Sequence, residues 1–151
     1  MSAVAGAGEG SRGPGAPIPA TLGDPAGVEP IRVLIMEDDY LIGLDIADAV
    51  EQAGMQVAAI VDQADRALLL AATEPIDFAT MDINLHGRPV GLELAQTLFD
   101  RFAIRSLFVT AYADRRLEQA AAAARPLGWC NKPFTPEALK LLLQAAGAQI
   151  E

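Results

Sequence analysis

Cysteine and histidine are almost absent from this 151-residue sequence, which contains one of each, Cys130 and His86. A single cysteine excludes a disulfide within the chain and fits a reducing compartment. The chain starts without the basic and apolar regions of a secretory signal. Its longest apolar run, Ala67–Ala72, is far shorter than the roughly 18 residues that cross a membrane. We therefore expect a cytoplasmic protein with no membrane partner.

Basic residues are also few, since 11 Lys and Arg stand against 20 Asp and Glu and give a formal net charge of −9 at pH 7. A phosphate backbone requires a basic face on its protein partner, so the composition argues against nucleic acid binding and favours a protein partner. Nine of the basic residues are arginines, and the only lysines are Lys132 and Lys140. Hydrophobic residues make up 52% of the chain, which is enough for the core of one domain.

Large apolar side chains are rare in the first 30 residues, of which 12 are Gly or Pro and six are Ala. Such a segment buries too little surface to order itself. We predict a disordered extension over 1–30, with a docking or localisation tail as the alternative, and a single folded domain over 31–151.

From Ile31 onward, short apolar runs alternate with stretches of helical periodicity. Ile31–Met36 is nearly all apolar, as expected of a strand buried on both faces. Gly54 is expected to end the first helix. Strands are predicted at 31–36, 56–61, 78–81, 106–109 and 127–130, and helices at 41–53, 63–73, 91–102, 114–124 and 136–146. This alternation predicts an α/β fold, a doubly wound five-stranded parallel sheet in the order 2-1-3-4-5 with helices on both faces.

Polar residues follow several of these strands at the edge where such a sheet binds its ligands. The residues at the strand ends are Glu37, Asp38 and Asp39 after the first strand, Asp82 after the third, Thr110 at the fourth, and Asn131, Lys132 and Pro133 at the fifth. Carboxylates that converge repel one another, and a hard divalent cation such as Mg²⁺ relieves the repulsion. Any one of these features alone has a plain structural explanation, such as a helix N-terminus or a loop, but their joint placement favours a functional site.

This set of residue types is suited to phosphoryl transfer. A carboxylate such as that of Asp82 is able to act as a nucleophile and form an acyl phosphate. Transfer then depends on positioning and charge neutralisation, which the metal and Lys132 would supply. Thr110 offers a hydroxyl donor to a phosphoryl oxygen.

The quoted residues resemble the receiver domains of bacterial two-component systems, which have the flavodoxin-like fold, over about 31–150. The resemblance rests on the motif MEDD, an Asp 44 residues after Asp38, the pair Thr110-Ala111, and Lys-Pro-Phe 22 residues after Thr110. It implies that Asp82 is the phosphoacceptor and that Thr110 and Lys132 contact the phosphoryl group. It also implies that Mg²⁺ is bound by Asp38 directly, by Glu37 mainly through water, and by the backbone carbonyl of Asn84.

Two departures point to a subgroup of this family. His86 stands where common receivers have a proline, and the loop DINLHGRPVG is one residue longer. With the stretch FVTAY, this resembles the alphaproteobacterial FATGUY group, whose single-domain regulators work with HWE or HisKA2 histidine kinases, although Ala111 replaces a glycine of that motif. In that group the helix corresponding to 114–124 is sometimes poorly ordered, and here it contains five successive alanines.

The resemblance also implies a conformational switch. Trp129, three residues before Lys132, holds the position of an aromatic residue that rotates on phosphorylation, and Tyr112 would share the movement with Thr110. A tryptophan that only packs at the rim is the alternative. His86 is interpreted as a loop residue without a special role, with a contact to a partner or to the acceptor loop as the alternative, and Cys130 as a small apolar strand residue.

The sequence thus predicts a single-domain response regulator that accepts a phosphoryl group on Asp82 from a histidine kinase or phosphotransfer protein. It would signal by protein contact or serve in a phosphorelay. A phosphohydrolase of the haloacid-dehalogenase type is a second hypothesis, which Asn84 disfavours because those enzymes have an acid at that position. A pseudo-receiver that binds partners independently of phosphate is a third.

Overall fold

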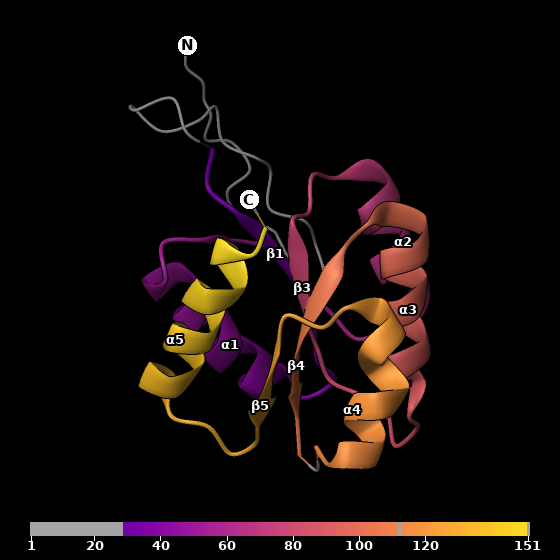
Figure 1. Ribbon diagram of the computed structural model, residues 1–151. Coiled ribbons are helices and arrows are strands. Elements are labelled where there is room, and N and C mark those ends of the chain that lie inside the picture. Colours follow the sequence, from indigo (N-terminus) through magenta and orange to yellow (C-terminus); the bar gives the residue numbers. More distant parts are fainter. Residues whose placement is uncertain (1–28, 112, 151) are drawn as a thin grey trace.

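The computed structural model describes residues 29–111 and 113–150 (Figure 1). The predicted extension therefore lies almost entirely outside the described residues, and so does Tyr112. Within these residues, five strands alternate with five α-helices and one 3₁₀ turn. In chain order they are β1 (Arg32–Met36), α1 (Tyr40–Gln52), β2 (Gln56–Val61), α2 (Ala64–Thr73), β3 (Phe78–Met81), α3 (Val90–Phe102), β4 (Arg105–Thr110), α4 (Arg115–Ala121), η2 (Ala122–Ala124), β5 (Gly128–Asn131) and α5 (Pro136–Ala148).

The strands form one parallel sheet in the order β2-β1-β3-β4-β5, which confirms the predicted topology. All five residues of β1 and all four of β3 are buried. These two strands lie inside the sheet and are covered on both faces, which explains why their sequences are apolar without alternation. Their carboxyl ends are adjacent, since Met36 pairs with Met81.

Helices α1 and α5 cover one face of the sheet, and α2, α3 and α4 cover the other (Figure 1). Alternate residues of β1 belong to the two cores: Val33 and Ile35 pack beneath α1 and α5, whereas Leu34 and Met36 pack toward α2 and α3. This alternation follows from the two-residue period of a strand. The sheet thus provides a rigid platform for the loops at its edges.

The starts of α1, α4 and α5 are fixed by side-chain caps that satisfy free backbone N–H groups. Asp39 caps α1 by accepting from Leu41 N and Ile42 N, and Asp114 caps α4 by accepting from Leu117 N. Thr135 caps α5, whose first residue is Pro136. Predicted element boundaries agree with the observed ones to within two residues, apart from the region 114–124.

The region 114–124 was predicted as a single helix but has two parts. Helix α4 ends at Ala121, and the alanine run continues as the 3₁₀ turn η2. Ala121 and Ala124 are buried, so small side chains hold this segment close to the sheet. Among the described residues, no helix is both long and apolar enough to cross a membrane.

Candidate functional site

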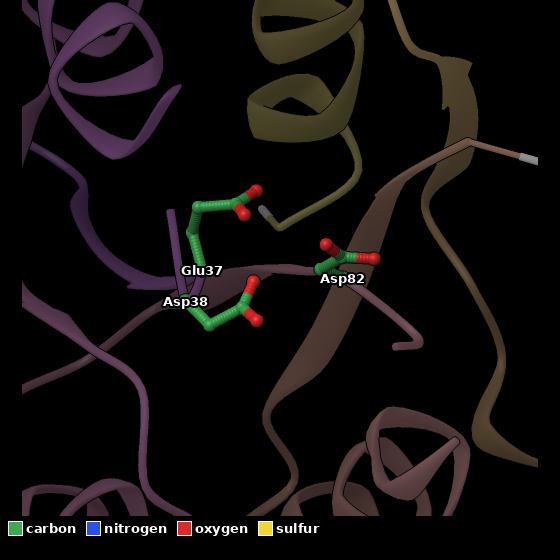
Figure 2. A group of neighbouring side chains, drawn as sticks. All are labelled: Glu37, Asp38 and Asp82. Carbon is green, nitrogen blue, oxygen red and sulfur yellow. The ribbon is translucent and has the colours of Figure 1, made fainter. Parts of the chain in front are cut away.

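Three carboxylates meet at the carboxyl ends of β1 and β3. Glu37 and Asp38 follow β1, Asp82 follows β3, and each offers an oxygen that lies within 4.8 Å of the others (Figure 2). Glu37 and Asp82 are 2% and 6% exposed, while Asp38 is more open to solvent. The topology therefore brings together the predicted acidic residues, with the exception of Asp39.

Asp39 does not join this cluster, although it was expected to converge with its two neighbours. Its carboxylate accepts hydrogen bonds from Leu41 N at 3.0 Å and Ile42 N at 3.3 Å, which makes it the N-cap of α1. Its backbone N–H in turn donates to Oε2 of Glu37 at 3.2 Å. Asp39 thus starts the helix and helps to hold the Glu37 side chain in the site.

Lys132, which follows β5, supplies a positive charge to two of the three carboxylates. Its Nζ lies 2.8 Å from Oδ2 of Asp82 and 2.7 Å from Oε1 of Glu37. Burial raises the pKa of Glu37, and the neighbouring Lys132 opposes that rise without cancelling it. Burial alone would lower the pKa of Lys132, but its hydrogen bonds with Asp82 and Glu37 outweigh burial and raise it. Lys132 is therefore held as a cation in the site.

The second oxygen of Asp82 is also engaged. Oδ1 accepts a hydrogen bond from the Thr110 hydroxyl at 3.1 Å and another from Asn84 N at 3.2 Å. Thr110 is 1% exposed and comes from the end of β4. Side chains from the ends of β4 and β5 and a backbone N–H from the loop after β3 therefore converge on the Asp82 carboxylate, as the strand order allows.

Asp38 is oriented by the loop that follows β3. The backbone N–H of His86 donates to Oδ2 of Asp38 at 2.8 Å. Burial acts to raise the pKa of Asp38, but this hydrogen bond and other local contacts prevail and lower it. The His86 imidazole reaches Asp62, which follows β2, with 3.1 Å between Nε2 and Oδ2.

Sequence reasoning did not single out Asp62 or Gly91. Asp62 follows the second strand directly, so the same rule about strand ends would have found it. Gly91 is required by close packing, because a Cβ at this position would collide with the carbonyl oxygen of Asp82 and would lie 2.6 Å from Cα of Ile83. Its N–H also donates to the carbonyl of Ile83 at 2.8 Å, so α3 begins in direct contact with the loop that contains Asp82.

Trp129 packs rather than projecting freely into solvent. Its ring stacks on that of Phe108, with 4.5 Å between centroids and 15° between planes, and the two residues pair in register across β4 and β5. Cys130 is buried, as predicted. Any movement of Trp129 would therefore have to break or slide this stack.

The donor set fits a hard divalent cation. Mg²⁺ prefers carboxylate and carbonyl oxygens and is commonly held by one or two carboxylates. Glu37, Asp38 and Asp82 offer such oxygens, and a single lysine compensates only part of their charge. A bound cation would relieve the remaining repulsion.

The fold and this site together define a class of protein: a doubly wound α/β domain with an acidic cluster at the switch point of the sheet and a lysine beside it. The family model of the response regulator receiver domain matches residues 33–144. The chain therefore belongs to the response regulator receiver domain family.

The individual proteins that the chain resembles share less than a third of its sequence. The transcriptional regulatory protein PdtaR of Mycobacterium tuberculosis is 29% identical over 106 residues, which cover 70% of this chain and 51% of that protein. The chain thus spans about half the length of this curated relative. A sensor protein from Polaromonas sp. JS666 superimposes with a TM-score of 0.70 at 28% identity and covers 80% of this chain and 98% of its own.

A third similar protein is a response regulator from Burkholderia pseudomallei, whose crystal structure is described as containing a phosphorylated aspartic acid, a calcium ion and citrate. It matches with a TM-score of 0.66 at 28% identity, over 79% of this chain and 71% of that protein.

Proposed function

We propose that this receiver domain is a phosphorylation switch in which Asp82 accepts a phosphoryl group in the presence of Mg²⁺. The observation that carries the proposal is the arrangement around one carboxylate: Lys132 Nζ lies 2.8 Å from one oxygen of Asp82, and the Thr110 hydroxyl lies 3.1 Å from the other. Both groups are hydrogen-bond donors. Thr110 ends β4 and Lys132 follows β5, the two strands on one side of β3 in the sheet. They would hold the oxygens of an incoming phosphoryl group as it transfers.

The donor is a phosphohistidine of a histidine kinase or of a phosphotransfer protein. A carboxylate oxygen of Asp82 attacks phosphorus, so that a new P–O bond forms while the P–N bond to the donor imidazole breaks. The imidazole leaves with the electron pair of the broken bond and takes up a proton. Lys132 balances the charge that develops on the phosphoryl oxygens, and Thr110 donates a hydrogen bond to one of them.

The cation site would be formed by Asp38, by Glu37 acting mainly through water, by Asp82, and by the backbone carbonyl of Asn84. When it is bound, Mg²⁺ neutralises charge on the acceptor and on the phosphoryl oxygens. The similar Burkholderia protein supports this assignment, since its crystal structure holds a phosphorylated aspartic acid together with a calcium ion.

Output from the switch would pass through protein contacts in the cytoplasm. On phosphorylation Thr110 turns toward the new group, Trp129 responds on the side of β4 and β5, and Tyr112 shares the change, which shifts an existing two-state equilibrium. We further propose that the domain, 31–151, belongs to the FATGUY group and is served by HWE or HisKA2 kinases. The segment 1–30 would be a disordered extension.

A second candidate function is a phosphate-independent pseudo-receiver. One observation favours it: His86 N already donates to Oδ2 of Asp38 at 2.8 Å, which leaves only the other oxygen of Asp38 for a cation. Such a module would bind its partner equally well with and without Mg²⁺ and phosphoryl donor. A single experiment on phosphoryl transfer to Asp82 therefore distinguishes the switch from the pseudo-receiver.

The test is intact-mass measurement after incubation with acetyl phosphate and Mg²⁺. Wild type should gain one phosphoryl adduct that hydroxylamine removes, because hydroxylamine cleaves acyl phosphates. The adduct should be absent in Asp82→Asn and without Mg²⁺, but present in Asp48→Asn, an exposed carboxylate on α1 that serves as the matched control. If wild type takes no adduct and beryllofluoride leaves the fluorescence of Trp129 unchanged, the pseudo-receiver replaces the switch.

A further inference from the structure

One residue, His86, joins the loops that follow three different strands. Its backbone N–H donates to Oδ2 of Asp38 beyond β1 at 2.8 Å, and its Nε2 lies 3.1 Å from Oδ2 of Asp62 beyond β2. His86 itself belongs to the loop that follows β3. The main-chain contact reaches the acidic cluster directly, whereas the side-chain contact reaches a residue outside it.

The loop that contains His86 is a tight turn with positive φ at both central residues. Leu85 and Arg88 pair as an isolated antiparallel bridge, with N-to-O distances of 2.9 and 3.1 Å. Between them, His86 and Gly87 have φ values of 54° and 76°. Positive φ at both central residues is the pattern of a type I′ turn, which favours Gly, Asn or Asp at these positions. Histidine adopts positive φ more readily than most residues but less readily than Gly, so a contact that holds its side chain stabilises the turn.

Asp62 supplies that contact. The two side chains are 50% and 46% exposed, so they are held by each other rather than by burial in the core. Asp62 and Gln63 line two pockets, of about 310 and 390 Å³. The first pocket also reaches Glu37 and Asp38, and the second reaches His86 and Arg88. A role in core packing therefore does not explain the pair.

We propose that Asp62 is a positioning residue for the cation site. By holding the His86 imidazole, it holds the turn 85–88, so that the His86 N–H fixes one oxygen of Asp38 and directs the other toward Glu37 and Asp82. Asp62 acts through His86 and does not touch the cation. An effect of Asp62 on phosphoryl transfer to Asp82 rests on the proposed function. An effect of Asp62 on cation affinity does not.

The first test compares Asp62→Ala with wild type in two measurements that need no phosphoryl donor. Without Mg²⁺, the His86 amide should exchange with solvent faster in the variant, because its hydrogen bond to Asp38 is no longer maintained. In calorimetric titration, the Kd for Mg²⁺ should rise about two- to fivefold, as expected for loss of a half-exposed pair. Asp65→Ala removes the same charge from a nearby exposed position and should match wild type in both measurements.

Substitution of His86 separates its side-chain role from turn strain. His86→Gly tolerates the positive φ but loses the imidazole, and it should weaken Mg²⁺ binding to the same extent as Asp62→Ala. The double variant should be no weaker than either single variant, because both remove the same contact. His86→Asn tolerates the turn and keeps an amide donor, so it should recover at least part of the wild-type affinity.

Phosphorylation kinetics provide the last measurement. The Asp62→Ala variant should need more Mg²⁺ for half-maximal phosphorylation but reach the wild-type rate at saturation. An unchanged Mg²⁺ affinity in Asp62→Ala and His86→Gly would overturn the positioning role, whatever the amide exchange shows. If wild type binds Mg²⁺ but accepts no phosphoryl group, the proposed function fails alone, and cation binding still decides the role of Asp62.

Discussion

Lys132 Nζ lies between two buried carboxylates, 2.8 Å from Asp82 and 2.7 Å from Glu37. Removal of one partner from a buried ion pair leaves uncompensated charge, which is more costly than loss of an exposed pair. The Lys132 side chain is 15% exposed, and those of Asp82 and Glu37 are 8% and 1% exposed. The lysine is thus important for the stability of the metal-free domain as well as for chemistry.

Lys132→Met should lower the free energy of unfolding by about 3–5 kcal/mol at neutral pH without Mg²⁺. Added Mg²⁺ should reduce the difference in the free energy of unfolding between this variant and wild type. The cation binds the folded state alone and replaces the missing positive charge. Urea denaturation with and without Mg²⁺ measures both effects. Lys140→Met makes the same change at the only other lysine and should differ from wild type by less than about 0.5 kcal/mol. An equal loss of stability in Lys132→Met and Lys140→Met would contradict the view that Lys132 stabilises the domain by compensating the charge of Glu37 and Asp82.

Gly91→Ala should disturb the acceptor loop, because the added methyl group meets backbone atoms of Asp82 and Ile83 rather than a movable side chain. We expect a loss of about 2–3 kcal/mol of stability, typical of overpacking, together with weaker Mg²⁺ binding. Thermal denaturation and calorimetric titration measure the two effects.

Gly43→Ala is the matched control for this substitution. Its nearest new neighbour is the Cγ2 methyl of Ile60 at 2.9 Å, a side-chain atom rather than the backbone that Gly91→Ala would meet. Alanine is also the better helix former, so stability should stay within about 1 kcal/mol of wild type. Wild-type Mg²⁺ affinity in Gly91→Ala would show that the loop adapts without disturbing the site.

The sheet order and the main site residues were predictable because simple rules apply to them. Runs of apolar residues mark strands buried on both faces, and Glu37, Asp38, Asp82, Thr110 and Lys132 follow from where those runs end. The carboxyl ends of parallel strands share one edge, so residues 50 positions apart in the chain, such as Asp82 and Lys132, were expected to meet.

Other features depend on local geometry that the sequence does not reveal. Asp39 was grouped with its acidic neighbours because helix α1 could begin at any of several residues, and only the backbone conformation shows that Asp39 is the cap. For His86, a contact with the acceptor loop was only the alternative interpretation, because a single loop histidine does not by itself indicate a turn with two positive φ angles. Asp62 gains its contact only through that turn, and the division of the alanine run into α4 and η2 has no clear signal in five identical residues.

Cys130 should be protected from thiol reagents in the folded domain. Its side chain is nearly fully buried, and burial raises the pKa of its thiol. The thiolate is the reactive species. Reaction with Ellman's reagent should therefore stay slow at the ordinary thiol pKa and should accelerate only at the higher pH at which the buried thiol ionises. At neutral pH the folded protein should react at least about a hundredfold more slowly than the urea-unfolded protein. Comparable rates in the two states would show that β5 opens readily.

Trp129 is the only tryptophan in the chain, so its fluorescence reports on a single position. Thr110 lies two residues after Phe108 on β4, and the Phe108 ring stacks on Trp129. Movement of the Thr110 hydroxyl from Asp82 toward a bound phosphoryl analogue should therefore alter this stack. We expect beryllofluoride with Mg²⁺ to change the fluorescence of wild type.

Thr110→Val keeps the shape of the side chain but removes the hydroxyl that donates to Asp82 at 3.1 Å. The fluorescence change with beryllofluoride should be largely lost in this variant and retained in Thr110→Ser, which keeps the donor. Thermal denaturation establishes that both variants are folded. If Thr110→Val responds as strongly as wild type, the signal reaches Trp129 by a route other than Thr110, and the coupling must then run through Lys132 at the end of β5, three residues from the tryptophan.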